Sequence, residues 1–486
     1  MALKILHVAA ECFPWLKTGG LADVIGALPT AQRVQGMDAR ILLPGFPAIR
    51  AGLLDAKRVA VVPPHFVASE CVLWQGKLPD GTPVYVIDAP SLFDRPGNPY
   101  ADGDQRPYPD NYRRFALLGW VAVQLAAGQL GGWRPDVLHA HDWHAGLAAA
   151  YLKHAALLRG SKLAASVFTV HNLAYQGLFP GDVFGELSLP GNFFQYDGLE
   201  FHGQLAFIKS GLQFSDRIAT VSPTYAREIQ SAEHGCGLDG LLRYRVAHLT
   251  GILNGVDAAS WNPAADPALP GHFDVEKTVG KARCKACLQK ELGLACAPNA
   301  LLFGVVSRLT EQKGLNLVLA GMQKLLAQGG QLVVLGSGEP ALEAGFKQME
   351  QDHPGSVVVR LGFEEPLSHR IFAGADVIMV PSRFEPCGLT QMYGMRYGAL
   401  PLARRTGGLA DTVVDCSLEN LADGTACGFV FERFEQPDFD AAVQRAFVLY
   451  AKPPIWREVR RHAMGRQFDW AAPAQAYLAL YRAAHK

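Results

Sequence analysis

The sequence has no excess of charge of either sign. Its 486 residues carry 45 Lys and Arg against 45 Asp and Glu, which gives a formal net charge of +0. Nucleic-acid-binding domains usually have a basic surface, and solvating tails are usually strongly acidic, so the composition favours neither class. We therefore expect no nucleic-acid partner, and any bound anion must be held by a local arrangement of groups.

Long apolar runs are missing as well. No window approaches the ~18 uninterrupted apolar residues that a membrane-spanning helix needs. The chain opens on an expected strand and not on a charged segment that leads into an apolar run and a cleavage site. From these features we expect a cytoplasmic protein with no membrane partner.

Metal-binding motifs are scarce. The nine cysteines are scattered, and Cys284 and Cys287 form a single C-x-x-C without a second pair at matching spacing. His139, His141 and His144 stand close together, but no H-E-x-x-H arrangement accompanies them. Reduced thiols fit the cysteines better than a disulfide framework does, and we expect no metal and no other cofactor, although zinc at either cluster stays an alternative.

What the chain does contain is a regular alternation of short apolar strands and helical stretches. With 49% apolar residues it can build two full cores, and its length is typical of two domains. Repeated strand–helix–strand units with strands apolar on both faces indicate parallel sheets covered by helices, an α/β fold. The expected strands are 5–10, 39–43, 84–88, 136–140, 166–170, 217–221, 301–307, 331–335, 357–361, 376–380 and 400–403.

A domain boundary is indicated around residues 252–257. There an Asn-Gly turn is followed by a Pro-rich stretch over 261–270. We expect one domain over 1–250 and a second over 251–463. The remaining segment, 464–486, reads as a helix with no strand of its own to pair with, so it must pack on a domain that is already built.

The turn after the first strand has the features of a phosphate cradle. Gly19 and Gly20 let the backbone approach a ligand, Lys17 adds a positive charge, and the helix that starts here offers unpaired N–H groups. The turn matches neither the G-x-x-x-x-G-K-S/T loop nor the G-x-G-x-x-G fingerprint. An ordinary strand–turn–helix corner stays open as the alternative.

The second domain has two further constellations at strand ends. Arg308 and Lys313 would stabilise a diphosphate, especially a departing one, unless they belong to a solvated basic loop. Glu385 lies between Phe384 and Pro386, where a carboxylate can hold sugar hydroxyls and stabilise positive charge at an anomeric carbon. Otherwise it only complements a helix dipole.

Two more features extend these constellations. The backbone N–H groups of Gly388, Leu389 and Thr390 start a helix and can hold a phosphate. The string TGGLAD at 18–23 returns at 406–411, so we expect two turns that face phosphate or sugar. Tyr100 and Trp143 can stack on a sugar ring or belong to the core, and the polar strand ends at His141 and His171 suit hydrogen bonds to sugar hydroxyls.

Assembled, these segments closely resemble the bacterial glycogen synthases, which are retaining α-1,4-glucan glucosyltransferases. The resemblance runs nearly end to end through KTGGLADVIGALP, RPDVLHAHDWHAGL, SVFTVHNLAYQG, ATVSPTYAREI, LNGVD, VSRLTEQKGL and PSRFEPCGLTQMYGMRYGALPLARRTGGLADTV. It implies the GT-B architecture, in which two Rossmann-like domains face a deep cleft and the last helix, here 464–486, crosses back to the first domain. It also implies glucose transfer from ADP-glucose to the non-reducing end of glycogen or another α-1,4-glucan, with release of ADP.

The resemblance assigns roles residue by residue. Lys17 and the Gly19–Gly20 turn would lie at the donor phosphates and the reacting sugar, and Arg308 and Lys313 at the diphosphate. Glu385 would be the principal catalytic carboxylate, and His171, helped by Asn172, would contact the donor glucose. Further matching site positions are Asp23, Asp142, Asn254 and Cys387, of which Cys387 is expected to line the site and not to act as a nucleophile; Tyr100 joins them as a substrate-binding candidate.

One position departs from the wider superfamily. Many retaining GT-B enzymes carry a second Glu eight positions after the first, and here that position is Tyr393, so the ribose contact must be sought elsewhere. With a single persuasive carboxylate, we expect same-face attack without metal in place of double displacement. A UDP-glucose-dependent synthase, a pyridoxal-dependent glucan phosphorylase and a silent glucan-binding protein remain alternatives.

Overall fold

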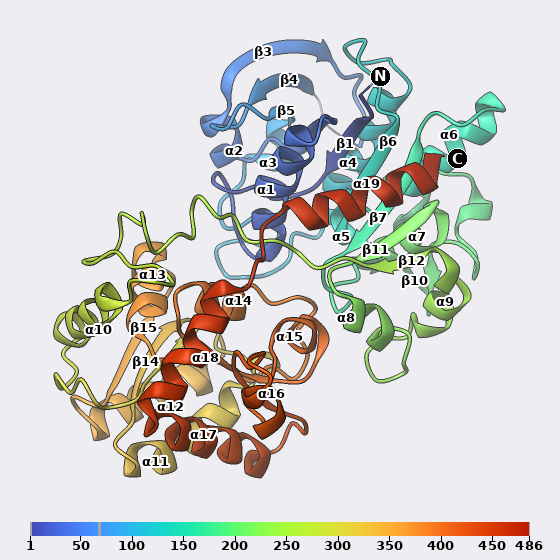
Figure 1. Cartoon of the computed structure of the whole chain (residues 1–486). Coiled ribbons are helices and arrows are strands. Elements are labelled where there is room, and N and C mark those ends of the chain that lie inside the picture. Colours follow the sequence, from blue (N-terminus) through green and yellow to red (C-terminus); the bar gives the residue numbers. More distant parts are fainter. Residues whose placement is uncertain (1, 67–69, 486) are drawn as a thin grey trace. The chain divides into compact units, whose positions relative to one another are not determined.

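The computed structural model describes residues 2–66 and 70–485, and its internal contacts divide the chain into two units (Figure 1). Unit 1 comprises Met1–Gly255 and Trp470–Lys486, and unit 2 comprises Val256–Asp469. The C-terminal segment therefore belongs to the core of the first unit.

Unit 1 is built on a sheet that, in the described part of the chain, has nine strands in the order β12-β11-β7-β6-β1-β2-β5-β4-β3. Neighbours from β12 to β5 run parallel, whereas β4 and β3 are added antiparallel at one edge. The strands are β1 Lys4–Val8, β2 Asp38–Pro44, β3 Leu54–Val61, β4 Val72–Lys77, β5 Pro83–Asp88, β6 Val137–His141, β7 Ala165–Val170, β11 Arg217–Thr220 and β12 Leu249–Gly251.

The helices of unit 1 connect these strands, and a small antiparallel sheet lies between β7 and α7. The helices are α1 Gly20–Val34, α2 Pro47–Gly52, α3 Pro90–Phe93, α4 Asn111–Ala126, α5 Asp142–Ala145, α6 Leu147–Arg159, α7 Phe207–Phe214, α8 Pro223–Glu228, α9 Asp239–Tyr244 and α19 Ala471–His485. The small sheet contains β8 Leu178–Pro180, β9 Glu200–Phe201 and β10 Gln204–Ala206. Short 3-10 turns occupy Gly181–Leu187, Gly191–Phe193 and Val246–His248.

The last helix, α19, packs on α1 and on the central strands β6, β7 and β11. Tyr477 and Tyr481 have no exposed surface, and they join Trp470, Ala474 and Leu480 in one apolar cluster with residues of β1, β6 and β7. The helix expected over 464–486 starts later, since α18 ends at Gly465 and α19 begins at Ala471. Its packing on an existing domain agrees with the sequence argument, because an amphipathic helix must bury its apolar face.

Unit 2 has a six-stranded sheet in its described residues, and every neighbouring pair is parallel, in the order β15-β14-β13-β16-β17-β18. The strands are β13 Leu302–Val306, β14 Gln331–Gly336, β15 Val357–Leu361, β16 Val377–Val380, β17 Leu400–Arg404 and β18 Phe429–Phe431. The helices are α10 Val279–Leu292, α11 Leu315–Ala327, α12 Pro340–Asp352, α13 Glu365–Gly374, α14 Thr390–Arg396, α15 Gly407–Thr412, α16 Leu418–Ala422, α17 Gln436–Tyr450 and α18 Pro453–Gly465, with a 3-10 turn at Glu311–Lys313. The expected α/β class with two Rossmann-like sheets is confirmed.

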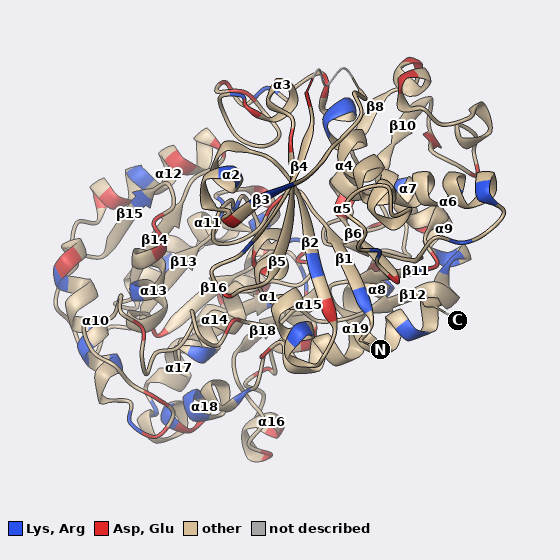
Figure 2. Cartoon of the chain, turned by 90° about the horizontal axis from the view of Figure 1, so that it is seen from above, with Lys and Arg blue, Asp and Glu red and all other residues tan. Residues whose placement is uncertain are grey.

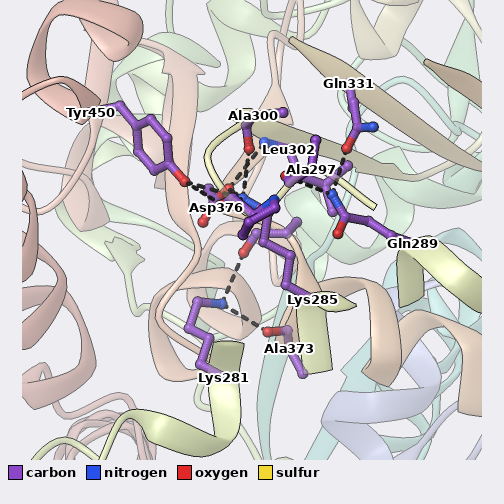
Figure 3. A network of polar contacts seen from close by, with 12 residues as sticks. Lys281, Lys285, Gln289, Ala297, Ala300, Leu302, Gln331, Ala373, Asp376 and Tyr450 are labelled. Carbon is purple, nitrogen blue, oxygen red and sulfur yellow. Dashed lines mark hydrogen bonds and ion pairs between the residues drawn. The ribbon is translucent and has the colours of Figure 1, made fainter. Parts of the chain in front are cut away.

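A buried ion pair holds α10 against the sheet of unit 2 (Figure 3). Lys285 Nζ lies 2.6 Å from Asp376 Oδ2, and both side chains are 8% exposed. The same ammonium donates to the carbonyl oxygen of Ala300 and to the hydroxyl of Tyr450, and Asp376 accepts the N–H of Leu302. Because every charge is compensated at short distance, the pair can stay ionised without water.

Charged residues of both signs are interspersed along the helices and loops of each unit (Figure 2). This distribution agrees with the balanced composition of the chain. None of the helices in the described ranges combines the length and the apolar character that crossing a bilayer requires.

Candidate functional site

Three polar segments of unit 1 lie at one edge of its sheet. Strands β7, β6 and β1 are neighbours and run parallel, so their carboxyl ends meet at the same edge. Glu11 and the Gly-Gly turn follow β1, Asp142 follows β6, and His171 and Asn172 follow β7. Ligands of open α/β sheets gather at such edges, which makes this edge the candidate site of unit 1.

The turn before α1 is open to solvent. Gly19, the N-cap residue, is extended with φ −160° and has no side chain to cap the helix, which begins at Gly20. A Cβ placed on Gly19 would meet nothing within 4 Å. Lys17 Nζ lies 2.8 Å from Asp23 Oδ1 in the first turn of the helix, so the residues of the expected cradle are brought together.

Glu11 shapes this loop, and the sequence analysis did not select it. It is 3% exposed, and its carboxylate accepts hydrogen bonds from Thr18 N at 2.6 Å, from Thr18 Oγ1 at 2.5 Å and from Gly19 N at 3.3 Å. The hydroxyl of Tyr100 also donates to it, and the Tyr100 ring stacks on His144 at 4.7 Å. Burial, and then the Glu11 charge, raise the pKa of Tyr100 well above its ordinary value. The only sequence signal for Glu11 was its place at a strand end.

Asp142 positions the next two site residues. It has a left-handed backbone with φ 57°, and its Oδ1 accepts the backbone N–H groups of His171 at 2.7 Å and Asn172 at 3.3 Å. Burial raises the pKa of Asp142 to about 7, against the lowering effect of these two bonds. Burial also lowers the pKa of His171 to about 3. Near neutral pH the imidazole of His171 is therefore uncharged.

A buried histidine cluster lies beneath this edge, and its membership differs from the expected trio. His7 joins His139 and His141, with ligand atoms within 4.8 Å of one another, whereas His144 stacks on Tyr100 outside the cluster. Every ring nitrogen of the three is hydrogen-bonded. Burial lowers the pKa of each. The hydrogen-bonding capacity of the cluster is therefore used by bonds among neutral rings and their neighbours.

In unit 2, the loops after β13 and β16 bring Lys313 and Glu385 together. Lys313 Nζ lies 2.6 Å from Glu385 Oε2, and Ser382 Oγ donates to the same oxygen at 2.8 Å. The close approach depends on Gly314, because a Cβ there would lie 2.0 Å from the carbonyl oxygen of Pro381. Arg308, in the same loop as Lys313, is exposed. The sheet edge of unit 2 thus presents Lys313 paired with a carboxylate that is 6% exposed, and Arg308 in the same loop as Lys313.

The second copy of the TGGLAD string has different surroundings from the first, and the expectation that its turn faces phosphate or sugar stays a prediction. Gly407 and Gly408 are buried. A Cβ on Gly407 would lie 1.9 Å from the carbonyl oxygen of Glu385, and one on Gly408 would lie 2.0 Å from that of Cys387. These glycines allow α15 to pack directly under the loop that carries Glu385, whereas Gly19 faces open space.

The remaining candidates of unit 2 surround the start of α14. Cys387 is 5% exposed, Gly388 has φ 68°, and Leu389 and Thr390 lead into the helix. The buried carboxamide of Gln391, which the sequence analysis missed, donates to the carbonyl oxygens of Cys387 and Gly388. Tyr393 is 8% exposed and stacks on Trp261 at 3.8 Å, so it is part of the core.

Two further features belong to unit 1. Asn254 is 7% exposed, and its Oδ1 is buried with no hydrogen-bond partner among the described residues. Trp143 lies beside an open hollow of about 470 Å³ that Tyr175, Gln176, Gly177 and Cys236 also line. The Asn254 oxygen offers an unused hydrogen-bond acceptor to a polar ligand, and the hollow beside Trp143 offers an open surface.

Comparisons with known proteins identify the family of the chain. Residues 4–244 match the family model of the starch synthase catalytic domain, and residues 300–446 match that of glycosyl transferases group 1. The chain is 58% identical to a glycogen synthase of Variovorax paradoxus and 53% identical to one of Francisella philomiragia, in each case with 99% of both chains covered.

Two solved structures are similar to this one. The catalytic domain of starch synthase IV from Arabidopsis thaliana, bound to ADP and acarbose, is 34% identical with a TM-score of 0.92, and 100% of both chains is covered. Sucrose-phosphate synthase from Thermosynechococcus elongatus is 17% identical with a TM-score of 0.59 over 99% of this chain and 98% of its own. At that identity the second similarity concerns the fold alone.

Proposed function

The chain belongs to the glycogen synthase family, and from this premise we propose that its donor is ADP-glucose and that it extends an α-1,4-glucan at the non-reducing end with retention of configuration. It is a glycosyltransferase with glycogen synthase activity, acting on a nucleotide sugar and a glucan. The choice of ADP draws support from the starch synthase IV structure, which was solved with ADP. A cytoplasmic location is part of the same proposal.

The observation that carries the mechanism is the cluster at the sheet edge of unit 2. Lys313 pairs with Glu385 at 2.6 Å, and Arg308 lies in the same loop. A guanidinium grips a phosphate through two parallel hydrogen bonds, and an ammonium supplies a point charge. We assign Arg308 and Lys313 to the donor diphosphate, whose negative charge grows as it leaves, and Glu385 to the glucosyl ring.

In the proposed step, the 4-hydroxyl oxygen of the glucan forms a bond to C1 of the donor glucose while the C1–oxygen bond to the diphosphate breaks. The hydroxyl proton passes to the departing phosphate oxygen, so that ADP leaves on the face that the acceptor enters and configuration is retained. A double displacement would need a nucleophilic carboxylate about 5 Å from a second carboxylate. Glu385 instead stabilises the positive charge that develops at C1.

We assign the edge of unit 1 to substrate binding. Lys17 offers a cation to phosphate or sugar oxygens, the turn at Gly19 and Gly20 leaves room beside it because a Cβ on Gly19 would meet nothing within 4 Å, and His171 offers a neutral imidazole. Supporting positions in the proposal are Asp23, Tyr100, Asp142, Asn172, Asn254, Cys387, Gly388, Leu389 and Thr390. The Trp143 and Tyr175 rings beside the hollow are suited to stack on the glucan.

The test is release of ADP or UDP from each nucleotide-glucose, with glycogen present or absent and with EDTA added. We expect glycogen-dependent ADP release that EDTA does not reduce. Release of UDP alone would indicate the UDP-glucose synthase, and no release from a folded protein would indicate a silent glucan-binding protein.

Variants test the role of Glu385. Glu385→Gln should lower kcat far more than it changes the KM for the donor, because the carboxylate acts in the transition state. Glu432→Gln is the matched control, since Glu432 is a 63% exposed carboxylate of the same unit that pairs with Arg405. Equal effects of the two substitutions would remove Glu385 from the mechanism.

A further inference from the structure

A continuous series of buried hydrogen bonds runs from His171 to the C-terminal helix. His171 Nε2 lies 3.0 Å from His141 Nδ1, and His141 Nε2 lies 3.0 Å from His7 Nδ1. His7 Nε2 lies 2.7 Å from Gln32 Oε1, and Gln32 Nε2 donates to the Tyr481 hydroxyl at 2.8 Å. The series therefore links a candidate site residue to α19 through groups that the mechanism above does not use.

A second branch leaves Tyr481 on its other side. The Tyr481 oxygen lies 2.8 Å from His139 Nδ1, and His139 Nε2 lies 2.7 Å from Thr169 Oγ1. Gln32, Tyr481 and the three inner histidines have no exposed surface. Water therefore cannot reach these five inner members of the series, whereas His171 is only partly buried.

All the imidazoles are neutral at physiological pH. Burial lowers the pKa of His7 to about 4 and that of His171 to about 3, and it also lowers the pKa values of His139 and His141 well below the ordinary value. A neutral imidazole carries one proton, so if one nitrogen donates, the other must accept. When such rings are hydrogen-bonded in series, the nitrogen that carries the proton on one ring determines which nitrogen carries it on the next. All the hydrogen bonds of the series therefore point the same way.

The orientation of the Gln32 amide sets that direction. A carbonyl oxygen only accepts, so Oε1 of Gln32 requires the proton of His7 on Nε2. His7 Nδ1 then accepts from His141 Nε2, and His141 Nδ1 accepts from His171 Nε2. The second nitrogen of His171, Nδ1, is left bare, and it has no hydrogen-bond partner among the described residues.

Tyr481 in turn holds the Gln32 amide. Its hydroxyl accepts the amide N–H and donates its own proton to His139 Nδ1, so that His139 Nε2 donates to Thr169. Reversing the amide would reverse every bond of the series and move the His171 proton to Nδ1. These are the two arrangements in which each of these bonds keeps one proton and the Tyr481 hydroxyl proton also has an acceptor within the series.

We propose that Gln32 and Tyr481 are positioning residues that hold His171 in the tautomer with its proton on Nε2, so that a bare Nδ1 faces the bound sugar. The dipoles of the aligned neutral imidazoles add up, and the negative end of the sum lies at Nδ1 of His171. Such a fixed dipole stabilises the positive charge that develops at C1. This inference rests on the proposed contact of His171 with the donor glucose.

The first measurement is the tautomer itself, by nitrogen-15 NMR of the histidine-labelled full chain without substrate. The signals of His171 are assigned by their loss in His171→Gln, and a bare ring nitrogen resonates far from a protonated one. We expect Nδ1 of His171 to be bare between pH 6 and pH 8. A proton on Nδ1, titration of the ring in that range, or a stoichiometric metal bound to the cluster would each overturn the inference.

Two variants should invert the tautomer. In Gln32→Met, His7 Nε2 loses its acceptor, and a buried N–H without a partner is less tolerable than a bare acceptor. In Tyr481→Phe, the same preference turns the Gln32 amide, so that its N–H groups face His7. Tyr477→Phe is the matched control, because Tyr477 is a buried tyrosine of the same helix whose hydroxyl lies 3.5 Å from Thr169, where the second branch ends, and not between Tyr481 and His171.

Glucosyl transfer from the donor is then measured in the same variants. We expect kcat/KM to fall about tenfold in Gln32→Met and Tyr481→Phe, which is the effect of losing one hydrogen bond when the His171 nitrogen at the sugar becomes a donor in place of an acceptor. In Tyr477→Phe we expect kcat/KM to stay within about twofold. Inversion of the tautomer without loss of kcat/KM would overturn the inference while leaving the proposed function intact. If the wild type transferred no glucose, the proposed function would fail, and the NMR result would still report the tautomer separately.

Discussion

Asp142→Asn should make the protein more stable near neutral pH. The substitution keeps the shape of the side chain, its Oδ1 acceptor for the N–H groups of His171 and Asn172, and tolerance of the left-handed backbone at φ 57°. What it removes is a carboxylate that is 6% exposed. Because burial is the main reason for its raised pKa, the charge itself should be what destabilises the fold.

The magnitude follows from the two pKa values. The folded protein keeps the Asp142 proton up to a pKa of about 7, whereas the unfolded chain releases it near 3.8. Stability therefore falls as the pH rises from 3.8 to 7, and the cost is complete above pH 7. A shift of about 3 units at 1.36 kcal/mol per unit gives an upper bound of about 4 kcal/mol.

The assay is urea unfolding of wild type and variant at pH 4, 6 and 8, followed by tryptophan fluorescence, since Trp143 adjoins the site. We expect equal stability at pH 4 and an advantage of about 2–4 kcal/mol for Asp142→Asn at pH 8. Asp216→Asn is the control, because Asp216 also accepts a backbone N–H but pairs with Lys162 at 2.9 Å at a partly exposed position. A difference for Asp142→Asn that does not change with pH would refute the reasoning.

Three further predictions concern packing and binding. Gly408→Ala should unfold unit 2 more easily or displace the Glu385 loop, since its Cβ would lie 2.0 Å from a carbonyl oxygen, whereas Gly19→Ala should leave the melting temperature unchanged and raise the KM of the donor. Asp376→Ala should lower the free energy of unfolding by about 3–5 kcal/mol, because the buried ammonium of Lys285 loses its ion-pair partner; chemical denaturation measures this difference. Trp143→Ala should raise the KM for glycogen severalfold with little change in donor KM, as measured by initial rates.

Much of the fold could be predicted because buried parallel strands are apolar on both faces. Each expected strand is present, with ends shifted by at most two residues. Most of the missed strands are short or exposed: β3 is mostly exposed and lies at the edge of its sheet, and β8, β9, β10, β12 and β18 have two or three residues each. The six-residue β4, which pairs with β3, was missed as well, since its residues are mostly half-buried without a clear alternation. Charged side chains on an edge strand protect a sheet from aggregation. The same side chains interrupt the apolar pattern from which a strand is predicted.

The candidate sites were predictable where charge and glycine stand at strand ends, as at Lys17, Lys313 and Glu385. The two TGGLAD strings could not be told apart from the sequence, because it does not distinguish a glycine that faces open space, such as Gly19, from glycines packed against a neighbouring loop, such as Gly407 and Gly408. Glu11 and Gln32 were missed for another reason, since their partners lie elsewhere in the sequence. Tyr100 is 89 residues from Glu11, and Tyr481 is 449 residues from Gln32.

The place of α19 in the core of unit 1 has a consequence for synthesis of the chain. A ribosome releases the chain from its first residue to its last, and domains generally fold in that order. Here Tyr477 and Tyr481, which complete the core around β1, β6 and β7, emerge only after the whole of unit 2. Unit 2 can therefore finish folding while the apolar cluster of unit 1 still lacks α19, and we expect unit 1 to reach its final packing only after the second unit has been made.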